Sequence, residues 1–517
     1  MQPARLSTRL ISGARILPRS RPISRPAVCS SRLQHRRYNQ SARLHDRAFA
    51  FPVPLRDRAS ENVPATNQTI DTAEDSSLQD ISVQGGFVQS LDPEASWHPA
   101  YLRDMCKCPR CRDPSSTQKT FQTTDIPGDI KARDVEIGED GSLSITWEND
   151  IPGFGPDHVS TFSVAVLHHH LSQRTRAEAR FEPPNPRPWS RKTITRELQS
   201  VTFEDYMKDE EALYRALFFL NLHGILLLKG VPESETAVEE ITSRMGTLRD
   251  TFYGRTWDVK SVPEAKNVAY THQYLGLHMD LLYMANPPGF QLLHCLKNTC
   301  EGGSSLFVDT LAAVSFLHPR RIKQLAENRI PYHYKNAGEH YYFEHPVLEM
   351  HQHNDRLVKH VNYSPPFQAD HLNNSQQGYE NFSSFLSSLR KFANLVEDPG
   401  FLFEYKMQEG ECVIFNNRRV LHGRRQFDAA HGERWLKGAY VDTDVFMSRF
   451  RVLNEKYELK GLEVLEKFVE KDLGIEKPKP KVPKPINYGS PFKKKERKGP
   501  MKKKVAIDPV AKDELPS

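Results

Sequence analysis

Short apolar stretches separated by turn residues fill the chain from about residue 265 to 445, and this pattern constrains the fold more than any other feature of the sequence. The turns include Asn-Pro-Pro-Gly at 286–289 and Glu-Gly-Gly at 301–303. Apolar runs bounded by Gly, Pro and Asn predict strands. Many such strands at close spacing favour a barrel or jelly roll, which buries the apolar faces of its strands.

Helical spacing flanks this β-rich region on both sides. Residues 203–222 carry apolar side chains at helical intervals and lead through Gly224 into 225–228, a short apolar run that predicts a buried strand. Residues 446–473 return to helical periodicity. We therefore expect an α+β fold, with a jelly-roll core at residues 190–475 and helices packed outside it.

Charge is distributed unevenly along the chain. Residues 1–45 hold ten Arg and no acidic residue, and residues 477–504 hold twelve Lys or Arg against one Glu. The whole chain has a formal charge of +6, so the remainder carries about −15. An acidic middle does not support a nucleic-acid site on the folded core. No run of about 18 apolar residues occurs, so no transmembrane segment is expected.

The two ends of the chain have the composition of appendages. The Arg- and Ser-rich, acid-free segment 1–45 predicts a mitochondrial transit peptide and hence a matrix location, the alternative being a basic leader without an address. Residues 46–85 predict a disordered linker, and 476–517 a disordered Lys/Pro-rich tail that cannot bury a core.

Three of the seven cysteines fall within six residues, as Cys106-x-Cys108-x-x-Cys111. Such close spacing suits a metal better than a disulfide framework, and thiolates in this arrangement can surround one tetrahedral Zn²⁺. Free or redox-active thiols are the alternative. We expect a small, β-rich, zinc-binding domain at residues 86–182, whose folding would depend on the metal because its core is small.

A second group of candidate ligands lies within the β-rich region. His278 and Asp280 fall in an apolar segment, 275–282, that predicts a strand, so both side chains would project from one face. His422 ends another apolar strand far downstream. Two His and one carboxylate form a facial triad for iron and leave positions open for other ligands. Arg434, twelve residues after His422, suits bidentate binding of a carboxylate.

Several longer motifs accompany this constellation in a fixed order. They are Tyr-Gly-x-x-Trp from Tyr253, Asn-Val-Ala-Tyr at 267–270, Pro-Pro-Gly-x-Gln-Leu-Leu-His-Cys at 287–295, Asn-x-Arg-x-Leu-His-Gly-Arg-Arg at 417–425 and Met-Ser-Arg at 447–449. Together they resemble the γ-butyrobetaine hydroxylase and trimethyllysine hydroxylase family of Fe(II)/2-oxoglutarate dioxygenases. The resemblance covers residues 87–455 and leaves out both appendages.

The resemblance implies a double-stranded β-helix core, Fe(II) at the triad, 2-oxoglutarate and O₂ as co-substrates, ascorbate as reductant, and a homodimer. It places Arg434 and Ser305 at the 2-oxoglutarate. It also implies that His158 completes the zinc site.

The substrate implied by the resemblance carries a trimethylammonium group. Such a cation donates no hydrogen bond, so aromatic faces bind it. The positions matching the family's aromatic cage are all aromatic here, and two polar positions, Asn267 and Asn362, match sites near the substrate. The cage positions are Tyr253, Trp257, Tyr270 and Tyr440.

The motif at 287–295 resembles γ-butyrobetaine hydroxylase more closely than trimethyllysine hydroxylase, which implies γ-butyrobetaine as the substrate and L-carnitine as the product. Trimethyllysine is an alternative, and so is another small molecule in a paralogous enzyme, because Met279 replaces a common Thr and residues 281–284 are unusually apolar. From a different class, the chain could be a non-catalytic zinc-binding mitochondrial interaction protein. The intact triad and Arg434 argue against that last hypothesis.

Overall fold

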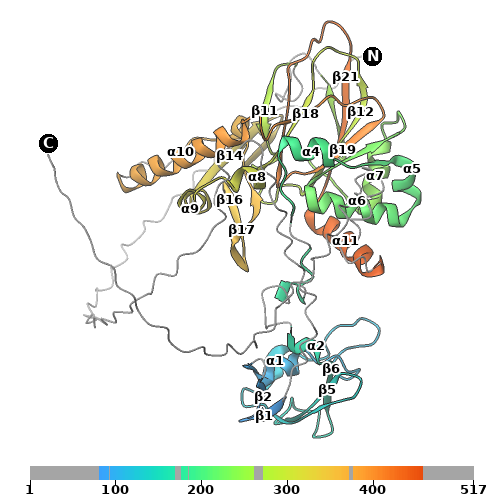
Figure 1. Cartoon of the computed structure of the whole chain (residues 1–517), viewed down its shortest axis with the longest axis vertical. Coiled ribbons are helices and arrows are strands. Elements are labelled where there is room, and N and C mark those ends of the chain that lie inside the picture. The colour runs from blue at the N-terminus through green and yellow to red at the C-terminus, as the bar shows by residue number, and fades with distance from the viewer. Residues whose placement is uncertain are drawn as a thin grey trace, which may run out of the picture. The chain divides into compact units, whose positions relative to one another are not determined.

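The computed structural model describes residues 81–91, 94–168, 176–177, 179–183, 186–260, 272–371 and 376–457 (Figure 1). The predicted transit peptide, nearly all of the predicted linker and the predicted tail lie outside these residues. These residues form a β-rich unit at 81–168 and a larger unit at 186–457. Among the described residues, no helix is both long and apolar enough to cross a membrane.

The N-terminal unit contains two three-stranded antiparallel sheets, ordered β1-β2-β3 and β4-β5-β6. In β5 the side chains of Leu143, Ile145 and Trp147 are buried in alternation, as the sequence pattern predicts. The first strand begins before residue 86, inside the predicted linker, because residues 82–84 pair with β2. The elements are β1 (Ser82–Gln84), β2 (Phe87–Leu91), β3 (Glu94–Trp97), α1 (Pro99–Asp104), η1 (Thr123–Asp125), β4 (Lys131–Ile137), β5 (Ser142–Glu148), β6 (Val159–Ser163) and α2 (Ala165–His168).

The larger unit is built around two facing sheets. The major sheet has the order β10-β21-β12-β19-β8-β7, with β9 paired to β21, and the minor sheet has the order β11-β20-β13-β18. Side chains from both sheets meet in one buried cluster, so the unit is a β-sandwich, consistent with the predicted jelly roll. The strands are β7 (Ser200–Thr202), β8 (Ile225–Lys229), β9 (Leu248–Arg249), β10 (Thr256–Lys260), β11 (Leu275–His278), β12 (Phe290–Asn298), β13 (Ser305–Asp309), β18 (Phe403–Tyr405), β19 (Glu411–Asn416), β20 (Val420–Arg424) and β21 (Arg434–Val441).

Helices cover the outer face of the major sheet, as Figure 1 shows for α5, α6, α7 and α11. The helical segment predicted at 203–222 is divided at Asp209, whose side chain accepts a hydrogen bond from the backbone of Glu211 and caps α6. Gly224, with φ 73°, ends α6 in the left-handed conformation that favours glycine. The helices outside the later insertion are α4 (Arg191–Glu197), whose Ile194 packs in the cluster between the sheets, and α5 (Phe203–Lys208), α6 (Glu210–His223), α7 (Ala237–Met245) and α11 (Thr443–Tyr457) on the outer face.

A long insertion between β13 and β18 adds further elements beside the minor sheet. Its described residues contribute two hairpins, β14-β15 and β16-β17, three α-helices and one 3-10 helix. Its apolar side chains share one buried cluster with residues of β11, β13 and β20. The elements are α8 (Thr310–Val314), α9 (Pro319–Glu327), β14 (Arg329–Asn336), β15 (Glu339–Pro346), β16 (Leu348–His351), β17 (Asn354–Val361), η3 (Pro365–Phe367) and α10 (Gln376–Val396).

A buried ion pair fixes the turn between β19 and β20. The guanidinium of Arg419 donates to both carboxylate oxygens of Asp309, at 3.0 and 2.7 Å, and also to the backbone carbonyls of Leu222 and Arg187. Asp309 in turn accepts from the backbone N–H of Trp189. Because both charged groups have hydrogen-bond partners, the ion pair can be buried. The Arg419 side chain thereby connects the turn after β19 with Asp309, Leu222 and Arg187.

Candidate active site and metal centres

The three predicted iron ligands converge at one end of the minor sheet. His278 on β11 lies directly opposite His422 on β20 in the antiparallel register. Nε2 of His278 lies 3.3 Å from Oδ1 of Asp280, and Nε2 of His422 lies 3.8 Å from Oδ2. The strand pairing thus brings together residues separated by more than a hundred positions.

The path of the chain between His278 and Asp280 differs from the predicted strand. The strand ends at His278, and Leu281 adopts the left-handed conformation with φ 61°, which is unusual for a leucine. Asp280 therefore points toward His278 because of a turn, and the strand alternation predicted for 275–282 is wrong beyond residue 278.

Asn417 holds the backbone of Asp280 in this turn. Its side-chain oxygen accepts a hydrogen bond from the N–H of Asp280 at 2.8 Å, and its Nδ2 donates to the carbonyl oxygens of Asp280 and Pro288 at 3.1 and 3.2 Å. Asn417 is fully buried in the loop after β19. It is the first residue of the Asn-x-Arg-x-Leu-His motif, but its contact with Asp280 could not be inferred from that motif.

The donor set fits a first-row divalent metal such as iron. Two cis ligands on bonds of roughly 2.1 Å would lie about 3 Å apart. The 3.3 Å separation of His278 and Asp280 is close to this distance, whereas the 3.8 Å separation of His422 and Asp280 is longer and would have to shorten around a bound ion. Nδ1 of His278 is 2.9 Å from the carbonyl oxygen of Gly276, so this nitrogen carries the hydrogen and Nε2 keeps its lone pair. Burial, together with the neighbouring His278, lowers the pKa of His422 to about 3, which keeps that imidazole neutral.

A cavity of about 60 Å³ lies beside the triad between the two sheets. Arg434 lines it, buried, and donates from Nε to the carbonyl oxygen of Gly303 at 3.3 Å. Burial lowers the pKa of Arg434 to about 10, so the side chain remains a cation, and no carboxylate among the described residues pairs with it. A buried cation of this kind requires an anionic ligand. The predicted Ser305 lines the same cavity.

The predicted aromatic cage is only partly described. Trp257 and Tyr440 stack on each other with ring centroids 4.0 Å apart, and the Tyr440 hydroxyl donates to Oδ2 of Asp280 at 2.7 Å. Gly438 permits this stacking, because a Cβ there would lie 2.3 Å from the Trp257 ring. Tyr253 lies beside Tyr283, with their hydroxyl oxygens 3.4 Å apart. Two further predicted positions, Asn267 and Tyr270, lie outside the described residues.

Asn362, the other polar candidate, is used within the protein. Its Nδ2 donates to the carbonyl oxygen of Pro346 and to Glu349, and its Oδ1 accepts from Arg418 at 2.9 Å. These bonds leave it no donor for the carboxylate of a substrate, so the predicted contact is wrong in this arrangement.

The N-terminal unit brings its four predicted ligands together. Nε2 of His158 lies 3.7, 3.5 and 3.3 Å from the sulfur atoms of Cys106, Cys108 and Cys111. Zinc–sulfur bonds of about 2.3 Å and zinc–nitrogen bonds of about 2.0 Å at a tetrahedral angle would separate the donors by roughly 3.5 Å. The donors are therefore spaced as one tetrahedral Zn²⁺ requires.

Two residues that the sequence did not reveal support this cluster. Asp150 accepts from Nδ1 of His158 at 2.7 Å, which leaves Nε2 free to bind metal. Arg103, completely buried between Phe121 and Phe154, forms an ion pair with Asp150 and donates to the sulfur of Cys111 at 3.3 Å. Its charge offsets that of the thiolates. No sequence spacing links these residues to the cysteines.

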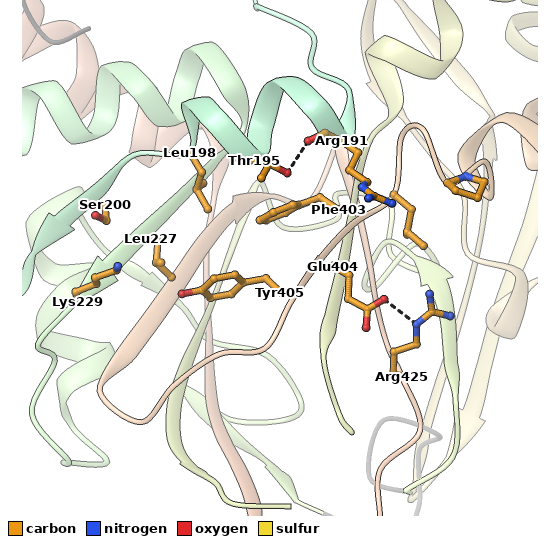
Figure 2. A pocket seen from close by; sticks show the side chains of 12 residues that line it. Arg191, Thr195, Leu198, Ser200, Leu227, Lys229, Phe403, Glu404, Tyr405 and Arg425 are labelled. Atoms are coloured by element: carbon orange, nitrogen blue, oxygen red, sulfur yellow. Dashed lines mark hydrogen bonds and ion pairs between the residues drawn. The ribbon is translucent and has the colours of Figure 1, made fainter. Parts of the chain in front are cut away.

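Figure 2 shows a second, wider pocket of about 700 Å³ in the larger unit. Its walls come from α4, β7, β8 and β18, and the carboxylate of Glu404 accepts from Arg425 at its edge. It shares no lining residue with the triad cavity and contains none of the predicted site residues. The triad cavity is therefore the candidate active site.

Comparison with known proteins gives matches for both units. Residues 186–440 match the family described as taurine catabolism dioxygenase TauD, TfdA family, and residues 90–168 match the γ-butyrobetaine hydroxylase-like N-terminal family. Dioxygenase str8 of Strobilurus tenacellus is 38% identical over 370 residues, which cover 68% of this chain and 84% of that protein. The γ-butyrobetaine dioxygenase of Homo sapiens is 32% identical, covering 71% and 94%. The trimethyllysine dioxygenase of Meyerozyma guilliermondii is 25% identical, covering 75% and 96%.

Replacing Asn417 should weaken metal binding although all three metal-ligand side chains are retained. Asn417→Ala removes three hydrogen bonds that hold Asp280 and Pro288, so we expect the affinity for Mn²⁺ or Fe²⁺ to fall by about 10- to 100-fold. Metal titration of the purified chain would measure this. Asn416→Ala is the matched control, because among the described residues the Asn416 side chain accepts a hydrogen bond only from the backbone N–H of Arg418. Equal metal affinity in the wild type and Asn417→Ala would show that Asn417 does not position Asp280.

Proposed function

Because the chain belongs to the family of iron- and 2-oxoglutarate-dependent dioxygenases that includes γ-butyrobetaine dioxygenase and trimethyllysine dioxygenase, we propose that it hydroxylates a small molecule carrying a trimethylammonium group. The preferred substrate is γ-butyrobetaine, which would become L-carnitine. The observation that carries the proposal is the aromatic wall beside the triad, where Trp257 stacks on a tyrosine that is hydrogen-bonded to Asp280.

The aromatic wall suits a cation but limits where the cation can lie. At 4.0 Å the facing rings of Trp257 and Tyr440 leave no room between them. A trimethylammonium group would therefore contact the outer face of Trp257, which lines the cavity. Tyr253 and Tyr270 are the proposed remaining walls. Each aromatic face in a desolvated site contributes on the order of 1 kcal/mol or more.

In the proposed reaction His278, Asp280 and His422 hold Fe(II). Bound iron supplies oxygen activation coupled to the conversion of 2-oxoglutarate and O₂ into succinate, CO₂ and a hydroxylated product. Arg434 binds the distal carboxylate of 2-oxoglutarate through charge-assisted hydrogen bonds, and Ser305 lies beside it. The Tyr440 hydroxyl and Asn417 orient Asp280, and the apolar walls exclude water.

Trimethyllysine is the second candidate substrate, and a different small molecule is the third candidate. Two observations favour the third candidate. Dioxygenase str8, whose name gives no substrate, is 38% identical to this chain, and in this chain Met279 replaces a common Thr and residues 281–284 are unusually apolar. A turnover assay with a panel of betaines, Fe(II), 2-oxoglutarate and ascorbate would discriminate these substrates.

We also propose that the N-terminal cluster binds structural zinc. Metal analysis should find about one zinc per chain, lost in Cys108→Ser and in His158→Ala. Asp150→Asn should keep the four ligands but weaken binding, because Nδ1–H of His158 and the guanidinium of Arg103 lose their shared anionic acceptor. Asp157→Asn, on the neighbouring exposed carboxylate, serves as the control. Wild-type protein free of zinc after expression in zinc-supplemented medium would refute the proposal.

For localisation we propose the mitochondrial matrix, on the basis of the ten arginines and no acidic residue in residues 1–45. A fluorescent protein fused to residues 1–45 should enter mitochondria. The same fusion with the arginines replaced by glutamine should stay in the cytosol. Equal distribution of the two fusions would mean that the segment carries no mitochondrial address.

Trp257→Leu tests for a trimethylammonium substrate. Leucine keeps an apolar surface but removes the aromatic face, so the KM for γ-butyrobetaine should rise roughly tenfold, which corresponds to about 1.4 kcal/mol. A neutral analogue with a tert-butyl group should bind the wild type poorly and respond little to the substitution. Decarboxylation of 2-oxoglutarate without substrate should survive, because Arg434 and the triad are unchanged. Equal turnover of the charged and neutral analogues by the wild type would assign the enzyme to a different substrate.

A further inference from the structure

Gln291 places a carboxamide in the wall of the active-site cavity. It lies on β12, where side chains alternate between the two faces of the major sheet. Gln291 and Leu293 line the cavity, whereas Phe290 and Leu292 pack in the core cluster beneath the helices. The other residues of β10, β12 and β21 that line this cavity are apolar except Arg434, namely Trp257, Val259, Leu293 and Leu436.

The carboxamide is buried and incompletely satisfied. Gln291 is 2% exposed, and its side-chain oxygen has no hydrogen-bond partner among the described residues. A buried polar atom without a hydrogen-bond partner destabilises the folded protein, and an apolar residue at this place in the wall would avoid that cost. Nitrogen and oxygen of an amide occupy nearly equivalent positions, so a 180° turn would present an N–H donor at the same point. The Gln291 amide can therefore either accept a hydrogen bond from a ligand through its oxygen or donate one through its nitrogen.

The strand register places Gln291 at the metal end of the cavity. Its partner across β12 and β21 is Tyr440, whose hydroxyl donates to Asp280. Arg434 stands at the other end of β21, opposite Asn298. A ligand held by Arg434 at one end and reaching the triad at the other would arrive beside Gln291.

We propose that Gln291 is a binding residue for the 2-oxo acid, donating a hydrogen bond to the end of the molecule that meets the triad. That end presents a carboxylate and a keto oxygen, which are both acceptors, so the N–H side of the amide matches it. Arg434 and Gln291 then hold the two ends of one ligand. The inference rests on the proposed binding of 2-oxoglutarate in this cavity.

The test uses the full chain loaded with Mn²⁺, which allows binding without turnover. Gln291→Leu should raise the Kd for 2-oxoglutarate by roughly tenfold or more, because a hydrogen bond to a charged group is lost. Gln291→Glu, nearly identical in shape, should raise it further by placing a carboxylate against a carboxylate. Calorimetric titration measures both. Gln324→Leu is the matched control, since the Gln324 oxygen on α9 is also buried without a partner but lies outside the cavity.

Three further measurements decide the outcome. The Kd for Mn²⁺ alone should match the wild type in Gln291→Leu, and its unfolding temperature should not fall, because the substitution removes a buried amide whose oxygen has no partner among the described residues. The KM for γ-butyrobetaine should change little in the same variant. An unchanged Kd for 2-oxoglutarate in Gln291→Leu would overturn the proposal. So would a rise in the KM for γ-butyrobetaine without a rise in the Kd for 2-oxoglutarate. If the wild type itself bound no 2-oxoglutarate, the assignment of the cavity would fail first, and this proposal with it.

Discussion

The antiparallel pairing of β11 with β20 is the interaction on which the site depends. It places His278 opposite His422, and the two strands approach so closely that a Cβ on Gly423 would lie 2.7 Å from the carbonyl oxygen of Leu275. Only glycine fits there without separating the strands. The pairing closes a long loop, which costs conformational entropy. The other edge of β20 is held by β13, and the Arg419–Asp309 ion pair fixes the turn that precedes it.

Much of the fold follows from local patterns in the sequence. The apolar run at 225–228 forms a buried strand as expected, and the alternation in 142–147 forms β5, because burial of one or both faces determines them. His422, which was expected to end a strand, lies in the middle of β20, after a turn that follows β19. Two element boundaries that were predicted wrongly, in 203–222 and in 275–282, depend on a helix cap and on a backbone turn. Asp209 caps a helix in the middle of a helical pattern, and Leu281 turns the chain in a conformation that apolar residues rarely adopt. Hydrophobic periodicity contains neither signal.

The site shows the same division. The candidate metal ligands could be predicted because metal binding demands particular residue types, and the structure brings each predicted set together. Three supporting residues could not be predicted, because each acts through contacts between segments that are far apart in the sequence. They are Arg103, Asp150 and Asn417. Family membership shows an oxygenase, so the hypothesis of a non-catalytic interaction protein is wrong.

Two clusters of different donor character on one chain have a consequence for the supply of metals. A site of nitrogen and oxygen donors binds Zn²⁺ more tightly than Fe²⁺, according to the general order of metal affinities. The His278–Asp280–His422 cluster therefore cannot select iron by affinity alone, whereas the thiolates of the N-terminal cluster favour zinc outright. Zinc would complete the N-terminal cysteine cluster, but abundant zinc would also occupy the His278–Asp280–His422 cluster in place of iron and inactivate the enzyme. Activity would then require a compartment in which available iron greatly exceeds free zinc.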